Sequence, residues 1–146
     1  MPIILNTNPY QQYKEQGVMT AGPMELVIKL YDGAVKQMKL AQMYLGDKKP
    51  DSAEKANKAL ILAQDILTEL IAGLKFNYQI ADTLFSYYVL ISRELATANV
   101  KKDPSKIEPL IEIMLELRDA WVTINKMEKV TAPELTYTTG KAAEDE

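Results

Sequence analysis

The chain has 146 residues and a formal net charge of −3 at pH 7, and it contains neither cysteine nor histidine. Disulfides, thiolate nucleophiles, His-dependent triads and most zinc sites are therefore excluded. Basic residues are interspersed with acidic ones and no apolar run is long enough to span a membrane, so we expect no nucleic-acid partner and no membrane insertion. The N-terminus lacks the basic region of a secretion signal, which favours one cytoplasmic domain.

The first predicted helix runs from Pro23 to about Leu45. Proline suits the first helical position, and Glu25 places a carboxylate near the positive end of the helix dipole. Gly46 is expected to end this helix as its C′ residue. The apolar positions at helical spacing, which predict the core face, are Met24, Val27, Tyr31, Ala34, Met38, Ala41 and Leu45.

The second predicted helix begins after Asp51, which forms a capping-box pattern with Glu54, and runs to about Lys75. Its core positions are Ala53, Ala56, Leu60, Ala63, Leu67, Leu70 and Leu74. After a connection from Phe76 to Gln79, a third helix is expected to stop at Asn99. Its core positions are Ala81, Leu84, Tyr88, Ile91, Leu95 and Ala98.

A fourth helix is predicted after Asp103 and Pro104, which restart the chain. Its core positions are Ile107, Leu110, Met114, Leu117, Trp121 and Ile124, while Glu108, Glu112, Glu116 and Asp119 fall on the opposite, solvated face. Four amphipathic helices with short loops predict an all-α, antiparallel up-down-up-down four-helix bundle over residues 23–128. Residues 1–22 are interpreted as an N-terminal lid segment, and 129–146 as a flexible acidic tail.

Helix one carries more apolar surface than one core stripe needs. At about 100° per residue, Leu26, Leu30, Leu40 and Tyr44 lie beyond one edge of the stripe, with Gly33 among them. This second apolar edge predicts a docking face for a partner. The alternative is that the N-terminal segment folds back and lays Tyr10 and Tyr13 over it; the two interpretations can describe two states of one surface.

Helix two offers polar groups beside its core stripe, near Ile61 and Ile71. Asn57, Gln64 and Thr68 could hydrogen-bond the main chain of a peptide lying between helices. The open alternative is that they are boundary residues bonded within the bundle or to water. The candidate partner-binding residues are Tyr10, Tyr13, Leu26, Leu30, Tyr31, Gly33, Asn57, Ile61, Gln64, Thr68 and Ile71.

No catalytic, cofactor or metal site is predicted. The sequence has no Glu-x-x-His motif for a di-iron bundle and no Gly-rich phosphate loop, and Glu112 and Glu116 are explained by a solvated face. We therefore expect a binding protein and not an enzyme. The pattern does not indicate an oligomeric state.

Several short motifs occur in an order that resembles the flagellar secretion chaperone FliS family. They are Asn8-Pro9-Tyr10, Tyr13, Thr20-Ala21-Gly22-Pro23, Glu25-Leu26, Leu30-Tyr31-Asp32-Gly33-Ala34, Ala63-Gln64-Asp65-Ile66-Leu67, Glu69-Leu70, Ala98-Asn99 and Leu117-Arg118-Asp119-Ala120-Trp121. Each motif is weak alone, but together they cover residues 8–125 and are specific.

The resemblance implies a cytoplasmic four-helix bundle that binds the disordered C-terminal segment of flagellin, prevents its premature polymerisation and assists its secretion. It also implies contact with the flagellar export apparatus, and a Tyr10 segment packed near the partner's path. The alternative is an adaptor or regulatory bundle that binds another amphipathic helical protein. A small helical enzyme retains only weak support, from tyrosine and carboxylate chemistry.

Overall fold

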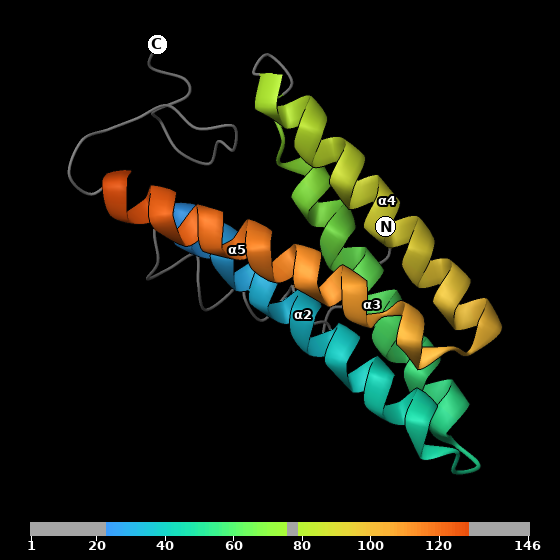
Figure 1. The fold of residues 1–146 in the computed structure, drawn as a ribbon. Helices are drawn as coiled ribbons and strands as arrows, with labels where there is room; N and C mark the ends of the chain where they lie inside the picture. The colour runs from blue at the N-terminus through green and yellow to red at the C-terminus, as the bar shows by residue number, and fades with distance from the viewer. Residues whose placement is uncertain (1–22, 76–78, 129–146) are drawn as a thin grey trace.

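The computed structural model describes residues 23–75 and 79–128. Within these ranges the chain forms four α-helices, α2 (Pro23–Asp47), α3 (Ser52–Ala72), α4 (Gln79–Lys101) and α5 (Glu108–Glu128), and a short 3-10 helix, η1 (Pro104–Lys106). Figure 1 shows that successive helices run in opposite directions. The predicted all-α four-helix bundle is confirmed. The proposed lid, with Tyr10 and Tyr13, and the proposed tail lie outside the described residues.

The bundle core consists of the apolar stripes that the sequence predicts. All predicted core positions of α2 and α4 are buried, and the acidic face of α5 is exposed. Three positions differ: Ala53, in the first turn of α3, is exposed, and Leu117 and Ile124 of α5 are half-buried against the core. Helical periodicity therefore identified most of the interior. It placed three positions too deep, and it did not assign five residues that are also buried: Leu30, Val35, Ala59, Ile66 and Ile111.

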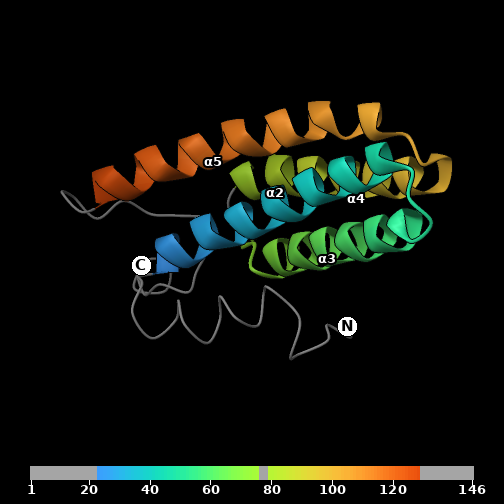
Figure 2. The same ribbon diagram turned by 90° about the horizontal axis from the view of Figure 1, so that it is seen from below.

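The helices do not surround the core evenly. The backbone of α2 packs closely against α3 and α5, and α3 packs against α4. No comparable backbone packing joins α4 to α5 within residues 79–128, and the two helices diverge away from η1 (Figure 1). Figure 2 shows α5 and α3 on either side of α2. One edge of α4 therefore lacks a closely packed helical neighbour in the described part of the chain.

Two helices end one or two residues beyond the predicted stops. α2 continues through Gly46 to Asp47, and Lys48, with φ of 62°, takes the left-handed position, so the prediction of Gly46 as C′ residue is wrong. α4 passes Asn99 and ends at Lys101, where Asp103 N donates to Ala98 O at 3.2 Å. Helix-end preferences are worth only about 1 kcal/mol, so the packing of the turns decides between neighbouring residues.

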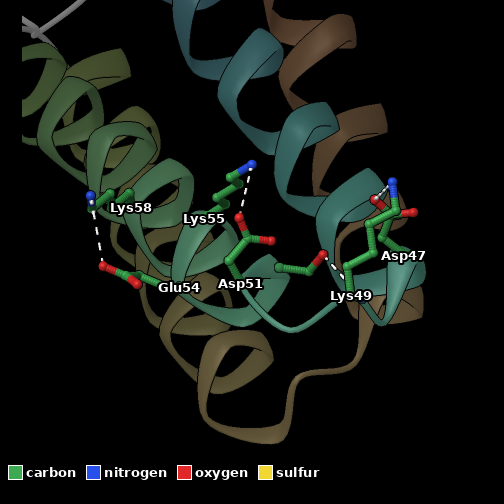
Figure 3. Close-up of polar contacts among 7 residues, drawn as sticks. Asp47, Lys49, Asp51, Glu54, Lys55 and Lys58 are labelled. Carbon is green, nitrogen blue, oxygen red and sulfur yellow. Dashed lines mark hydrogen bonds and ion pairs between the residues drawn. The ribbon is translucent and has the colours of Figure 1, made fainter.

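The predicted capping box at the start of α3 is also wrong. Among the described residues the Asp51 carboxylate makes no capping hydrogen bond, and it pairs instead with Lys55 Nζ at 3.2 Å (Figure 3). Glu54 pairs with Lys58 at 3.8 Å. These ion pairs draw both carboxylates along the helix surface and away from the backbone N–H groups. At its other end α3 stops at Ala72, three residues before the predicted end at Lys75.

No helix within residues 23–75 and 79–128 has the length and hydrophobicity that crossing a bilayer requires.

Candidate partner-binding surface

The centre of the bundle holds three hydrogen-bonded aromatic residues from three helices. The hydroxyl oxygens of Tyr31 (α2) and Tyr88 (α4) are 2.5 Å apart, and Trp121 Nε1 (α5) donates to the Tyr31 oxygen at 3.1 Å. The two tyrosine rings meet edge to face, with centroids 6.1 Å apart. Burial, followed by the neighbouring Tyr88, raises the pKa of Tyr31, so its hydroxyl stays protonated. This central aromatic triad ties α4 and α5 to α2.

Tyr31 therefore lies in the interior, although the sequence also placed it among the partner-binding candidates. Its side chain is fully buried and holds α2 against α4 and α5, so in this conformation it offers no surface to a partner. Trp121 is buried as well, which confirms the expectation of an enclosed tryptophan on the last helix.

The second apolar edge of α2 is largely covered. Leu30 is 5% exposed and Gly33 is buried, while Leu26 is half-buried. Leu40 and Tyr44 are also half-buried and pack against the core. The structure thus brings Leu26, Leu30 and Gly33 together on one edge of one helix, as predicted, but little of that edge is open to solvent.

Two of the three polar candidates of α3 form hydrogen bonds to α4, and the third is bonded within α3. Gln64 Nε2 donates to the Ser92 carbonyl oxygen at 3.1 Å, and Asn99 Nδ2 donates to Asn57 Oδ1 at 2.6 Å. The exposed Thr68 hydroxyl donates to the Gln64 carbonyl oxygen of its own helix at 3.0 Å. The structure thus contains the internal bonds that the sequence left open as an alternative. A role for these residues in binding a partner stays a prediction.

Two apolar candidates lie near this row of polar groups. Ile61 falls between Asn57 and Gln64 on α3 and is 46% exposed, whereas Ile71 is half-buried. The edge of α3 beside α4 therefore combines an accessible branched aliphatic side chain with amides that already hold the two helices together.

The sequence analysis missed a stripe of exposed apolar side chains on α4. Ile80, Tyr87 and Leu90 are each at least 40% exposed and share one side of the helix, which we call the α4 apolar stripe. Helical spacing places this stripe away from Ser92, the residue that faces α3. It is exposed because α5 diverges from α4. A helical wheel of α4 would have identified the second stripe, but only the packing of α5 determines its exposure.

Among the described residues there is no group of three acidic side chains that could hold a metal ion. Exposed apolar side chains along α4, together with the exposed Ile61 of the neighbouring α3, are typical of a helical bundle that binds other polypeptides. The described geometry is that of a helical protein-binding module.

The comparisons with known proteins identify the family. Residues 6–128 match the family model described as flagellar protein FliS, and the chain therefore belongs to this family. A relative named flagellar secretion chaperone FliS, from Bacillus subtilis (strain 168), is 34% identical over 114 residues, covering 78% of this chain and 84% of the relative.

Two further relatives carry the same name. The protein of Salmonella typhimurium (strain LT2) is 32% identical over 114 residues, covering 76% of this chain and 82% of the relative. That of Escherichia coli (strain K12) is 25% identical over 108 residues, covering 73% and 79%. The similarity thus extends over most of each chain, and the family match over residues 6–128 includes all the helices described above.

Proposed function

We propose that this chain is a flagellar export chaperone. In the cytoplasm it binds the disordered C-terminal segment of flagellin, prevents premature polymerisation and assists delivery to the flagellar export apparatus. The observation that carries the proposal is membership of the FliS family over residues 6–128, with relatives named as secretion chaperones. The chain acts by binding and not by catalysis.

The exposed apolar residues of α3 and α4 support this function physically. A disordered segment cannot bury its own apolar side chains. It can bury them against this protein when it lies along Ile61 and the α4 apolar stripe. Leu26, Leu30, Gly33 and Ile71 extend the proposed surface. Tyr10 and Tyr13, from outside the described residues, remain proposed as contacts of a lid that shares this surface with the partner.

Calorimetric titration with a synthetic peptide of the flagellin C-terminal region tests the proposal. We expect saturable binding with a negative heat-capacity change, because apolar surface is buried, and only a modest loss of affinity at high salt. In full-length flagellin, the bound C-terminal segment should be unavailable for filament contacts. The chaperone should therefore delay flagellin polymerisation, which light scattering follows.

A matched pair of α4 variants locates the binding surface. Leu90→Ser removes an apolar group of the α4 apolar stripe and should weaken binding about tenfold. Val100→Ser changes a side chain that is 82% exposed near the end of the same helix and should leave binding unchanged. No saturation with the wild-type protein would refute flagellin binding, and capture of a different amphipathic helix would then favour an adaptor.

A further inference from the structure

Gln37 of α2 is a buried polar residue whose side chain has no hydrogen-bond partner among the described residues. It is 7% exposed, and among the described residues the only other buried polar side chain is Ser52. The Ser52 hydroxyl oxygen accepts a hydrogen bond from Lys49 N at 3.3 Å. The Gln37 amide, in contrast, forms no side-chain hydrogen bond within residues 23–75 and 79–128, and this difference requires an explanation.

A buried amide without hydrogen bonds is unfavourable. The glutamine side chain carries two N–H donors and a carbonyl acceptor, and burial removes the water that would otherwise satisfy them. Nearly all buried polar groups in folded proteins are paired, so an unpaired one is a candidate for a group that acquires its partner on binding. An apolar residue at this position would avoid the penalty in the free protein.

Three other amides of α2 and α3 each already have a hydrogen bond within the bundle. Gln64 donates to Ser92 of α4, and Asn57 accepts from Asn99 of the same helix. Gln42, one turn and a half further along α2, donates to Glu108 Oε1 at 2.7 Å. Gln37 thus retains the hydrogen-bonding capacity that the sequence analysis assigned to Asn57 and Gln64.

The neighbours of Gln37 favour a polypeptide main chain as its partner. Gly33 and Ala41 lie one turn before and one turn after it on α2, and both are buried. Because Gly33 has no side chain, another backbone could come close here once the groups that cover this edge in the free protein have moved aside. A peptide group offers one N–H and one C=O, and the glutamine amide can accept from the first and donate to the second. The adjoining Leu30 supplies apolar contact.

We infer that Gln37 hydrogen-bonds the main chain of the flagellin C-terminal segment when that segment covers this edge of α2. The inference rests on the proposed function and adds to it a residue that would bind the partner's main chain. A disordered segment brings unpaired main-chain groups to an apolar surface, and these lose water on binding. Because the bond exists only in the complex, it favours the bound state over the free one.

Gln37→Leu tests the inference, with Gln42→Leu as the matched control on the same helix. Each variant is melted thermally and titrated with the flagellin C-terminal peptide. Gln37→Leu should melt at or above the wild-type temperature, because an unpaired buried amide is replaced by an apolar group, and should bind about tenfold more weakly. Gln42→Leu should bind like the wild type.

A second experiment addresses the main chain directly. Peptides in which single amides are replaced by esters lose one N–H each. One ester position should weaken binding to the wild-type protein, and the same position should have no effect on Gln37→Leu. Loss of sensitivity at a single position is the signature of a bond between that N–H and the Gln37 carbonyl oxygen.

The remaining outcomes are also decisive. Equal affinities of Gln37→Leu and the wild type would overturn the inference while leaving the proposed function intact, whereas a wild-type protein that does not bind would refute the proposed function itself. A lower melting temperature for Gln37→Leu would mean that the amide is bonded within the chain, and conversion of a dimeric wild type to monomers would assign it to a second copy. Either result overturns the inference.

Discussion

Tyr87 and Tyr88 are adjacent in α4 and lie in opposite environments. Tyr88 is fully buried and shares a hydrogen bond with Tyr31 of α2, whereas Tyr87 is 40% exposed on the α4 apolar stripe. The inner face of α4 therefore holds the bundle together, and its outer face leaves apolar surface available. One face of a helix can thus contribute to stability while the other is available for binding. Substitutions on the inner face should lower stability, and substitutions on the outer face should weaken binding.

The largest expected effect comes from truncating the inner tyrosine. Tyr88→Ala removes a buried ring and leaves the Tyr31 hydroxyl without this partner, so the free energy of unfolding should fall by about 3–5 kcal/mol. Tyr87→Ala should change it by less than about 1 kcal/mol while weakening binding of the flagellin peptide. Urea denaturation and titration of both variants check this. Equal losses of stability would show that the outer face is also structural.

The burial of the inner aromatic residues could be predicted from the sequence. Tyr31, Tyr88 and Trp121 all fall on apolar stripes at helical spacing, which is a local property of each helix. Their hydrogen bonds could not be predicted, because Tyr31 and Tyr88 are 57 residues apart and meet only through the packing of the helices. Local patterns therefore identify what is buried but not which buried polar atoms meet.

The exposure of apolar residues outside the core stripes depends on the arrangement of the helices. Leu30 and Leu90 both lie outside the expected core stripes, yet Leu30 is 5% exposed and Leu90 is 41% exposed. The difference at Leu90 follows from the divergence of α4 and α5, which no local sequence pattern encodes. The same limit applies to Gln37, which does not belong to the core stripe and whose burial only the structure reveals.

An intermediate effect is expected where α3 meets α4, between the inner and outer faces. If the two amides bonded only a partner, Asn57→Ala with Gln64→Ala would change stability by less than about 1 kcal/mol and weaken binding at least tenfold. The bonds to Asn99 and Ser92 change this expectation: the double variant should lose about 1–3 kcal/mol of unfolding free energy. Thermal melting, combined with titration of the folded fraction, distinguishes a role in the bundle from a role in binding. Unchanged affinity would show that both amides serve only the bundle.

The smallest effect is expected at the outer contact between α2 and α5. Arg118 donates two hydrogen bonds to the Asp32 carboxylate, the second at 3.5 Å, and the two side chains are 31% and 48% exposed. Asp32 also raises the pKa of Arg118, chiefly through the side-chain hydrogen bond, so the guanidinium stays protonated. Water and salt screen such a pair, and its coupling should be below about 1 kcal/mol.

A double-mutant cycle with Asp32→Asn, which keeps the size of the side chain, and Arg118→Gln, which removes the guanidinium, measures that coupling. The coupling should decrease further in high salt, whereas the stability conferred by the central aromatic triad should not, because Tyr31, Tyr88 and Trp121 are uncharged and buried. A coupling above about 2 kcal/mol, insensitive to salt, would place the ion pair with the interior contacts. In that case α5 would be held to α2 from outside as firmly as from within.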